Sequence, residues 1–386
     1  MRRILTLALL VCTSLPLHSL ASPGDQARAR VMATFAQKDG ARIVVDPVRI
    51  EAEWERAPFD PLPYTYSFDE IRDNWPHIMR SLKIPYPSPD YLRERYSRFP
   101  DMMHDLGYQD ADWEMHSLNV LEVWQAFFRG DFRKARDLGI RYGGYAQIPG
   151  VFAQLMQALY LTRSEQVKQM LLQDAIDRIQ AYAQSAPFLP GETEFHQDYV
   201  IFRLGFAYAV GRLAEDVPVP VMLANGYAPM VINAANEAMA VDPDHALTLA
   251  LNAAFDANVI RRVGKTAGRM TFNAQPINAG EIFGRAVELA GDMAIVRYEY
   301  ANSLLYMEQT RETEEAIRQL EAAAAAEPTY SMEVLDQLYA KKRLEEVRAL
   351  QQSGMGFRGF DRARRRHMER SGDNLYCVLL PPFKPL

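Results

Sequence analysis

The chain has 386 residues, of which 48% are hydrophobic and 24% are charged, and its formal net charge is -6. This length is ample for a large core. The acidic balance argues against sequence-independent nucleic-acid binding, which depends on clustered positive charge.

The first 21 residues have the composition of a secretory signal peptide. Arg2 and Arg3 precede an apolar run, and a small-x-small pattern ends at Ala21. We expect this segment to be removed and the mature chain to be periplasmic or released. Loss of the two arginines lowers the 43 basic residues to 41 against 49 acidic ones, a formal charge of -8. Cys12 is lost as well, which leaves Cys377 without an internal disulfide partner. No later run is apolar enough to predict a transmembrane segment.

Residues 22–111 are predicted to form an N-terminal arm. Prolines and aromatic residues alternate densely between Ala57 and Pro100. Prolines at this density prevent long helices while the aromatic side chains still require burial, so we expect an extended arm with short helices packed on the main body. Four aromatic residues of the arm could line a ligand groove, or could simply anchor the arm. They are Trp54, Tyr64, Tyr66 and Trp75.

Helical periodicity dominates from Asp112 to Gln351. Asp112 is a plausible N-cap, and the segment Gly130 to Ala135 predicts a tight turn between two helices. Further amphipathic patterns follow, separated by proline breaks at 187–190 and 217–220. A shorter helix pair is expected at 331–339 and 344–351.

The most regular unit lies between Gly280 and Tyr330. Apolar residues of its first helix recur at steps of three and four, which places them on one face; they are Met293, Val296, Tyr300, Leu304 and Met307. The second helix carries alanines on one side and charges on the other, and Pro328 ends it.

The small and large residues in this unit, together with the Gly-x-aromatic-x-x-Ala turn at Gly130 to Ala135, resemble the tetratricopeptide repeat. The resemblance implies an all-α, right-handed solenoid of helix pairs over residues 112–351, flanked by the arm and by a C-terminal tail at 352–386. It also implies a non-catalytic protein that offers a concave surface to a protein partner. A weaker similarity is to the T component of tripartite periplasmic (TRAP) transporters, which would imply a small-ligand or transporter accessory role.

One segment interrupts the repeat pattern. The stops at Pro243, Gly291 and Pro328 are 48 and 37 residues apart, and the excess length falls at 261–277. Glycines and a proline there predict a loop, and inserted loops of helical arrays often carry the binding face. Its basic residues are the candidate partner-binding set: Arg261, Arg262, Lys265 and Arg269.

Metal-dependent catalysis is a third hypothesis. His104, Asp105 and His116 lie in the densest group of histidines and acids, although helix capping explains most of the neighbouring acids equally well. No serine or cysteine stands in a nucleophile motif, so no catalytic residue and no cofactor is predicted. The basic run between Arg362 and Arg370 has two interpretations, an anionic partner or a helix paired with acids of the same chain.

Overall fold

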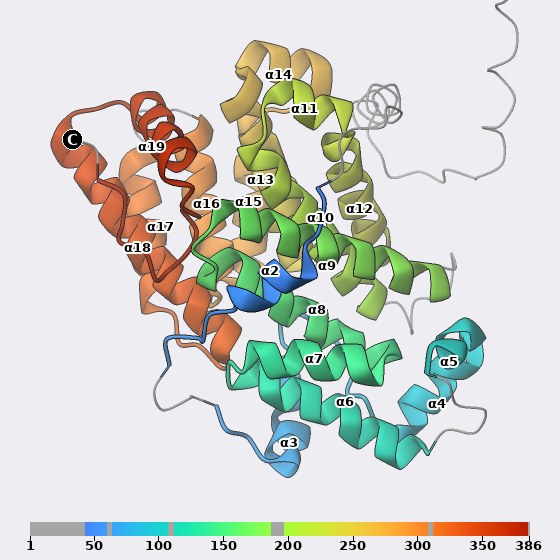
Figure 1. Ribbon diagram of the computed structural model, residues 1–386. Helices are drawn as coiled ribbons and strands as arrows, with labels where there is room; N and C mark the ends of the chain where they lie inside the picture. Colours follow the sequence, from blue (N-terminus) through green and yellow to red (C-terminus); the bar gives the residue numbers. More distant parts are fainter. Residues whose placement is uncertain (1–42, 60–63, 107–111, 187–196, 308–311, 385–386) are drawn as a thin grey trace, which may run out of the picture.

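The computed structural model describes residues 43–59, 64–106, 112–186, 197–307 and 312–384. Within these ranges the regular elements are helices, apart from an isolated antiparallel bridge between Ser164 and Asp373. The prediction of an all-α fold is confirmed (Figure 1). No helix in the described part of the chain is both long and apolar enough to span a membrane.

Four short helices belong to the arm: α2 (Pro47–Ala52), α3 (Phe68–Ile78), α4 (Pro89–Arg98) and α5 (Pro100–Leu106). The body begins with α6 (Trp113–Phe128), α7 (Phe132–Tyr142), α8 (Gln147–Met156), α9 (Glu165–Ser185) and α10 (Gln197–Asp216). It continues with α11 (Val219–Ala224), α12 (Tyr227–Val241), α13 (Ala246–Val263), α14 (Lys265–Phe272) and α15 (Pro276–Ala290). The last helices are α16 (Ala294–Met307), α17 (Glu312–Ala325), α18 (Ser331–Ser353) and α19 (Phe357–Ser371).

Local sequence explains the first helix pair of the body. The Asp112 carboxylate accepts a hydrogen bond from the Met115 N–H at 3.0 Å, as an N-cap does. Between α6 and α7 the chain turns at Gly130, whose φ of +84° is accessible mainly to glycine. Asp131 then caps α7 through the N–H of Lys134 at 3.3 Å. The predicted start of α6 and the turn that follows it are confirmed.

Helices close in sequence pack against one another along the body, for example α6 on α7, α10 on α12 and α17 on α18. Helices α7 and α8 cross closely at Gly139 and Gly150. A Cβ atom added at Gly139 would lie 2.9 Å from the Gly150 Cα atom, so a side chain there would force the helices apart.

The two ends of the array contact each other. Helix α18 packs on α6, and the Tyr330 ring lies 5.5 Å from that of Phe128. The tail after α19 returns to the segment that follows α8, where the Asn374 amide donates to three backbone carbonyl groups, including that of Thr162 at 2.7 Å. These contacts join the last elements of the array to its first helix and to the segment after α8.

The arm is anchored on this body by buried polar contacts. Arg95 of α4 forms an ion pair with Asp198 of α10, with both side chains almost completely buried. The hydroxyl groups of Tyr64 and Tyr66 donate to the backbone carbonyls of Pro328 and Thr329, just before α18. The predicted packing of the arm on the helical body is present.

Two expectations about the C-terminal half were wrong. The predicted loop at 261–277 is mostly helical, because Gly264 at φ +84° turns the chain in one residue and α14 starts directly after it. Gly268 does not break α14 but lets it approach α13, since an added Cβ would lie 3.2 Å from a Val259 methyl group. The predicted pair at 331–351 is one helix, α18, because no glycine or proline interrupts it.

Candidate functional site

The four basic residues predicted to bind a partner separate into two kinds. Arg261 forms an ion pair with Asp361 of α19 at 2.6 Å, and its guanidinium lies over the Tyr306 ring. Arg262 donates to the backbone carbonyl groups of Glu215 and Val217. These two arginines connect helices of the same chain. Lys265 and Arg269 are exposed on α14.

Three of the four aromatic residues predicted to line a groove lie near one another, since the Tyr64 and Tyr66 rings are 6.1 Å apart and the Tyr66 and Trp75 rings both contact Phe128. The Trp54 ring packs under the Arg136 guanidinium, and the buried Trp75 donates its indole N–H to the Ile84 carbonyl at 2.8 Å. Tyr64 and Tyr66 make the backbone contacts given above. None of the four lines the cavity described below, and all four hold the arm in place.

The predicted metal candidates are only partly described. His104 and Asp105 lie on α5, but their side chains are outside the described part of the structure. His116 is buried on α6, where Nε2 lies 2.9 Å from the Tyr96 hydroxyl, and burial lowers its pKa to about 4. Among the side chains that are described, no three histidine, cysteine, aspartate or glutamate residues converge to hold a metal ion.

The basic run of the tail lies on helix α19, and two of its arginines pair with acids of the same chain. Arg364 is buried against Glu346, and Arg365 forms an ion pair with Asp361 at 2.7 Å. Arg370 donates to the Arg366 carbonyl. These contacts favour the interpretation of a helix paired with acids of its own chain.

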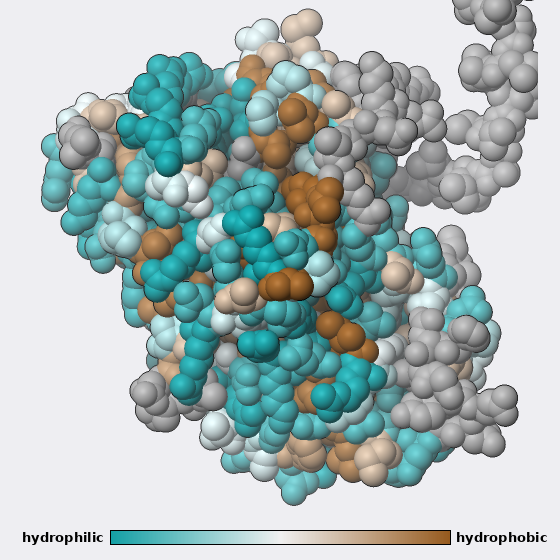
Figure 2. Space-filling model, viewed as in Figure 1, coloured by the Kyte–Doolittle hydropathy of each residue, from teal (hydrophilic) through white to brown (hydrophobic). Residues whose placement is uncertain are grey.

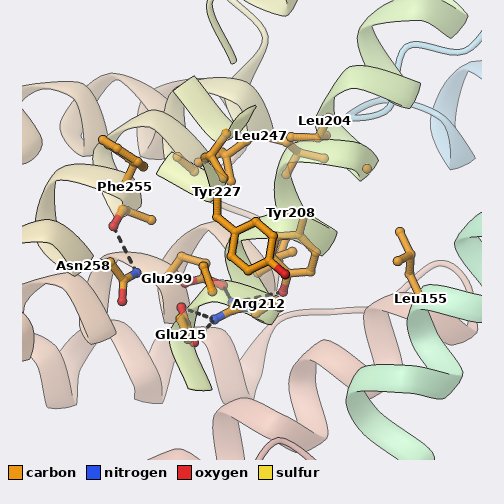
Figure 3. Close-up of a pocket in the computed structure, with 18 of the residues that line it drawn as sticks. Leu155, Leu204, Tyr208, Arg212, Glu215, Tyr227, Leu247, Phe255, Asn258 and Glu299 are labelled. Carbon is orange, nitrogen blue, oxygen red and sulfur yellow. Dashed lines mark hydrogen bonds and ion pairs between the residues drawn. The ribbon is translucent and has the colours of Figure 1, made fainter. Parts of the chain in front are cut away.

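The clearest candidate site is an apolar cavity inside the body, with a volume of about 140 Å³ (Figure 3). Its walls come from α8, α10, α12, α13 and α16, with single residues from the arm, α11, α14 and α18. Apolar side chains provide most of the lining; they include Phe152, Leu155, Leu204, Val231, Leu247 and Phe255.

Small residues of two helices form part of the cavity lining. Gly205 and Gly211 lie on α10, and Ala250 and Ala254 lie on α13, all of them in the lining. A Cβ atom added at Gly211 would meet only a Val231 methyl group, at 3.9 Å. The space beside Gly211 is therefore open to a larger side chain.

Charged and polar side chains close one end of the cavity. Arg212 pairs with both Glu215 and Glu299, and all three side chains are at most about one tenth exposed. Figure 3 shows these three at the same end as Tyr208, whose hydroxyl accepts from Arg212 Nη2 at 3.1 Å. Arg212 Nη1 also donates to the Tyr376 hydroxyl at 2.7 Å. The remaining N–H donor, Nε, is buried without a hydrogen-bond partner.

The charged groups at this polar end shift one another's pKa values. Burial lowers the pKa of Arg212, but the negative charge of Glu299 and other nearby groups raises it well above its usual value, so the guanidinium stays charged. Burial raises the pKa of Glu299, and the attraction of Arg212 opposes this shift.

A chain of buried hydroxyl groups leads from the cavity into the core. Tyr208 is 3.1 Å from the Tyr298 hydroxyl, which contacts Tyr160, and Tyr160 donates to the Asp336 carboxyl group at 2.7 Å. Burial raises the pKa of Asp336 to about 8, while the hydrogen bond from Tyr160 opposes the shift and the charges of Glu333 and Glu299 add to it. Asp336 is therefore largely protonated at neutral pH.

Sequence analysis missed this site. The sequence contained two weak signals of it. One was the glycine and alanine residues at 205, 211, 250 and 254, and the other was the pair Arg212 and Glu215 in α10. Small residues are also what any close helix crossing requires, so these signals do not distinguish a cavity from tight packing.

Comparison with known proteins adds no relative, since no family model, curated protein or solved structure matches the chain. The functional argument therefore depends on the geometry of the cavity.

Proposed function

We propose that this protein is a non-catalytic binding protein that encloses a small, mainly apolar ligand in the cavity between α8, α10, α12, α13 and α16. The observation that carries the proposal is an apolar chamber with buried polar groups at one end, the usual form of a small-molecule site. Most residues of the lining are buried in the core, which favours a small ligand over a long protein segment in an open concave groove.

The volume of the cavity sets the size of the group that can be held inside it. An engineered apolar cavity of about 150 Å³ in another protein stays dry and binds benzene. At about 140 Å³, the present cavity has room for a group on the order of one aromatic ring. An empty apolar space of this size weakens packing, so a ligand that fills it would stabilise the folded chain.

The proposal includes export, as the signal-like segment at residues 1–21 predicts. A small-ligand role outside the cytoplasm is also what the similarity to the TRAP T component implied. Protein sequencing of the chain purified from its native cells would test export, with an N-terminus near residue 22 as the expected result.

The binding test compares two glycine variants. Gly211→Met adds a side chain beside the open space of the cavity, whereas Gly284→Met adds the same side chain on α15, where nothing lies within 4 Å. We expect toluene to raise the melting temperature of the native protein and of Gly284→Met. It should have little effect on Gly211→Met. Absence of any stabilisation of the native protein at saturating toluene would overturn the proposal.

A protein partner is the second candidate function, and a surface on α14 and α15 favours it. Met270 is 80% exposed and Ile277 is 66% exposed, beside the exposed Lys265 and Arg269. Figure 2 shows apolar side chains gathered over the region where Figure 1 places α11 and α14.

The partner test changes only the exposed basic residues, since Arg261 and Arg262 support the fold. We expect the double variant Lys265→Glu and Arg269→Glu to lose a partner that the native protein captures from a periplasmic extract. The matched control is Arg285→Glu, an exposed residue of α15 outside this surface. Equal capture by the native protein and the double variant would remove this candidate.

A further inference from the structure

The polar end of the cavity specifies the chemistry of the ligand, an inference that depends on the proposed function. Four formally charged side chains contribute to the lining, the bases Arg212 and Arg262 and the acids Glu215 and Glu299. Their formal charges cancel. An ionised ligand buried here would bring a charge without a counterion, and burying an unpaired charge is strongly unfavourable.

The hydrogen bonds already made at this end decide whether a ligand can still find a donor or an acceptor there. The terminal nitrogens of Arg212 already donate to Glu215, Tyr376, Tyr208 and Glu299. Its Nε is shielded from solvent and from the cavity space, so a ligand acceptor cannot reach it. Both terminal nitrogens of Arg262 donate to backbone carbonyl groups. The arginines that line the cavity therefore have little donor capacity left for a carboxylate or phosphate.

Acceptor capacity remains on Glu299. A carboxylate has about four lone-pair positions. The contacts of Glu299 are with Arg212 and Tyr208, whereas both oxygens of Glu215 already accept from Arg212 and one also accepts from Tyr376. A ligand hydroxyl group at this end would find an acceptor on Glu299 and no competing charge.

We propose that the ligand is an uncharged molecule about the size of one ring that carries a hydroxyl group, and that this hydroxyl donates its hydrogen bond to Glu299. The apolar walls hold the ring, and the Arg212–Glu299 pair fixes its orientation. Carboxylic acids of the same size are excluded because their anions would lie beside two glutamates without a free cation.

The test uses three probes of nearly equal size: toluene, benzyl alcohol and benzoate. Their dissociation constants are measured at pH 7 by calorimetry with the full-length mature protein, and Gly211→Met serves as the blocked control. We expect benzyl alcohol to bind on the order of tenfold more tightly than toluene, as for a hydrogen bond to a charged acceptor. Benzoate should bind at least tenfold more weakly than benzyl alcohol.

A second measurement assigns the preference to Glu299. Glu299→Gln keeps the size of the side chain and leaves Arg212 paired with Glu215, and it gives the lining a formal charge of one positive unit. The ratio of benzyl alcohol affinity to benzoate affinity should fall at least tenfold in this variant. An unchanged ratio would overturn the role of Glu299.

The outcomes separate this inference from the proposed function. If native protein binds toluene and benzyl alcohol equally, or binds benzoate as tightly as benzyl alcohol, the hydroxyl inference is wrong while the apolar cavity remains a binding site. If none of the three probes binds, the proposed function and the inference that depends on it both fail.

Discussion

Two apolar regions of this molecule are packed in opposite ways. In the aromatic block, formed by Trp75, Trp124, Phe127, Phe128 and Tyr330, the rings interlock at edge-on or stacked contacts. Trp75 lies 5.7 Å from Trp124, and Trp124 lies 5.5 Å from Phe128. Around α10 and α13, glycine and alanine residues belong to the lining of a cavity of about 140 Å³.

The difference shows two uses of side-chain size: large side chains stabilise one region, and small side chains leave space for binding in the other. Large rings fill the space where the arm, α6 and the start of α18 meet, and each ring contributes a large buried area. Small residues on α10 and α13 forgo those contacts and leave room for a ligand. We therefore expect substitutions in the aromatic block to act mainly on stability, and substitutions in the cavity wall to act mainly on binding.

The largest effect is expected for Trp124→Ala in the aromatic block. Trp124 is fully buried, and its removal would leave a large void among rings that cannot close it. We expect a loss of about 3–5 kcal/mol in the free energy of unfolding, measured by urea denaturation. Trp54→Ala, a partly buried site of the arm, is the control and should cost clearly less. A smaller loss for Trp124→Ala would show that the block is not close-packed.

The next effect depends on pH and concerns Asp336, behind the polar end of the cavity. Its folded-state pKa of about 8 lies above the unfolded value of 3.8. Its contribution to stability is therefore complete below about pH 4. It is lost progressively above that value, until the pH has risen through 8. Relative to Asp336→Asn, native protein should lose about 1.4 kcal/mol of stability per pH unit between pH 5 and pH 7.

Denaturation at several pH values checks this prediction. Two buried histidines, His116 and His245, affect stability in the opposite direction. Burial lowers the pKa of each to about 4, so their contribution to stability rises with pH instead of falling. Their contributions are common to both proteins and cancel in the difference between native protein and variant. Asp244→Asn, at an exposed position, is the control and should follow the native profile. A difference that does not vary with pH would contradict the protonation of Asp336.

The smallest effect is expected at the cavity wall. Leu247 lines the cavity and already lacks contacts on one side, so Leu247→Ala should cost about 2 kcal/mol, the low end for buried leucine. Leu213 on α10 is fully buried outside the lining, and Leu213→Ala should cost about 3–4 kcal/mol. Denaturation of both variants tests the comparison, and equal losses would mean that the wall is packed as tightly as the core.

The helical class and several helix boundaries could be predicted from the sequence, because local interactions decide them. Asp112 caps α6 with its own side chain, Gly130 permits the turn that follows, and the stop at Pro243 comes directly after α12. Prediction failed where local signals were ambiguous. Gly264 and Gly268 led to the prediction of a loop. In the structure Gly264 turns the chain in a single residue, and Gly268 lets α14 pack against α13.

The candidate site was decided by tertiary structure. Arg212 and Glu299 are 87 residues apart and meet only because α10 and α16 both reach the interior of the closed array. Tertiary contacts also pair Arg261 with Asp361 and Arg262 with the Glu215 carbonyl, although the sequence alone presented both arginines as free positive charge. A local pattern shows which face of a helix is apolar. Whether the facing helices fill the space or leave a cavity depends on how side chains from distant segments fit together.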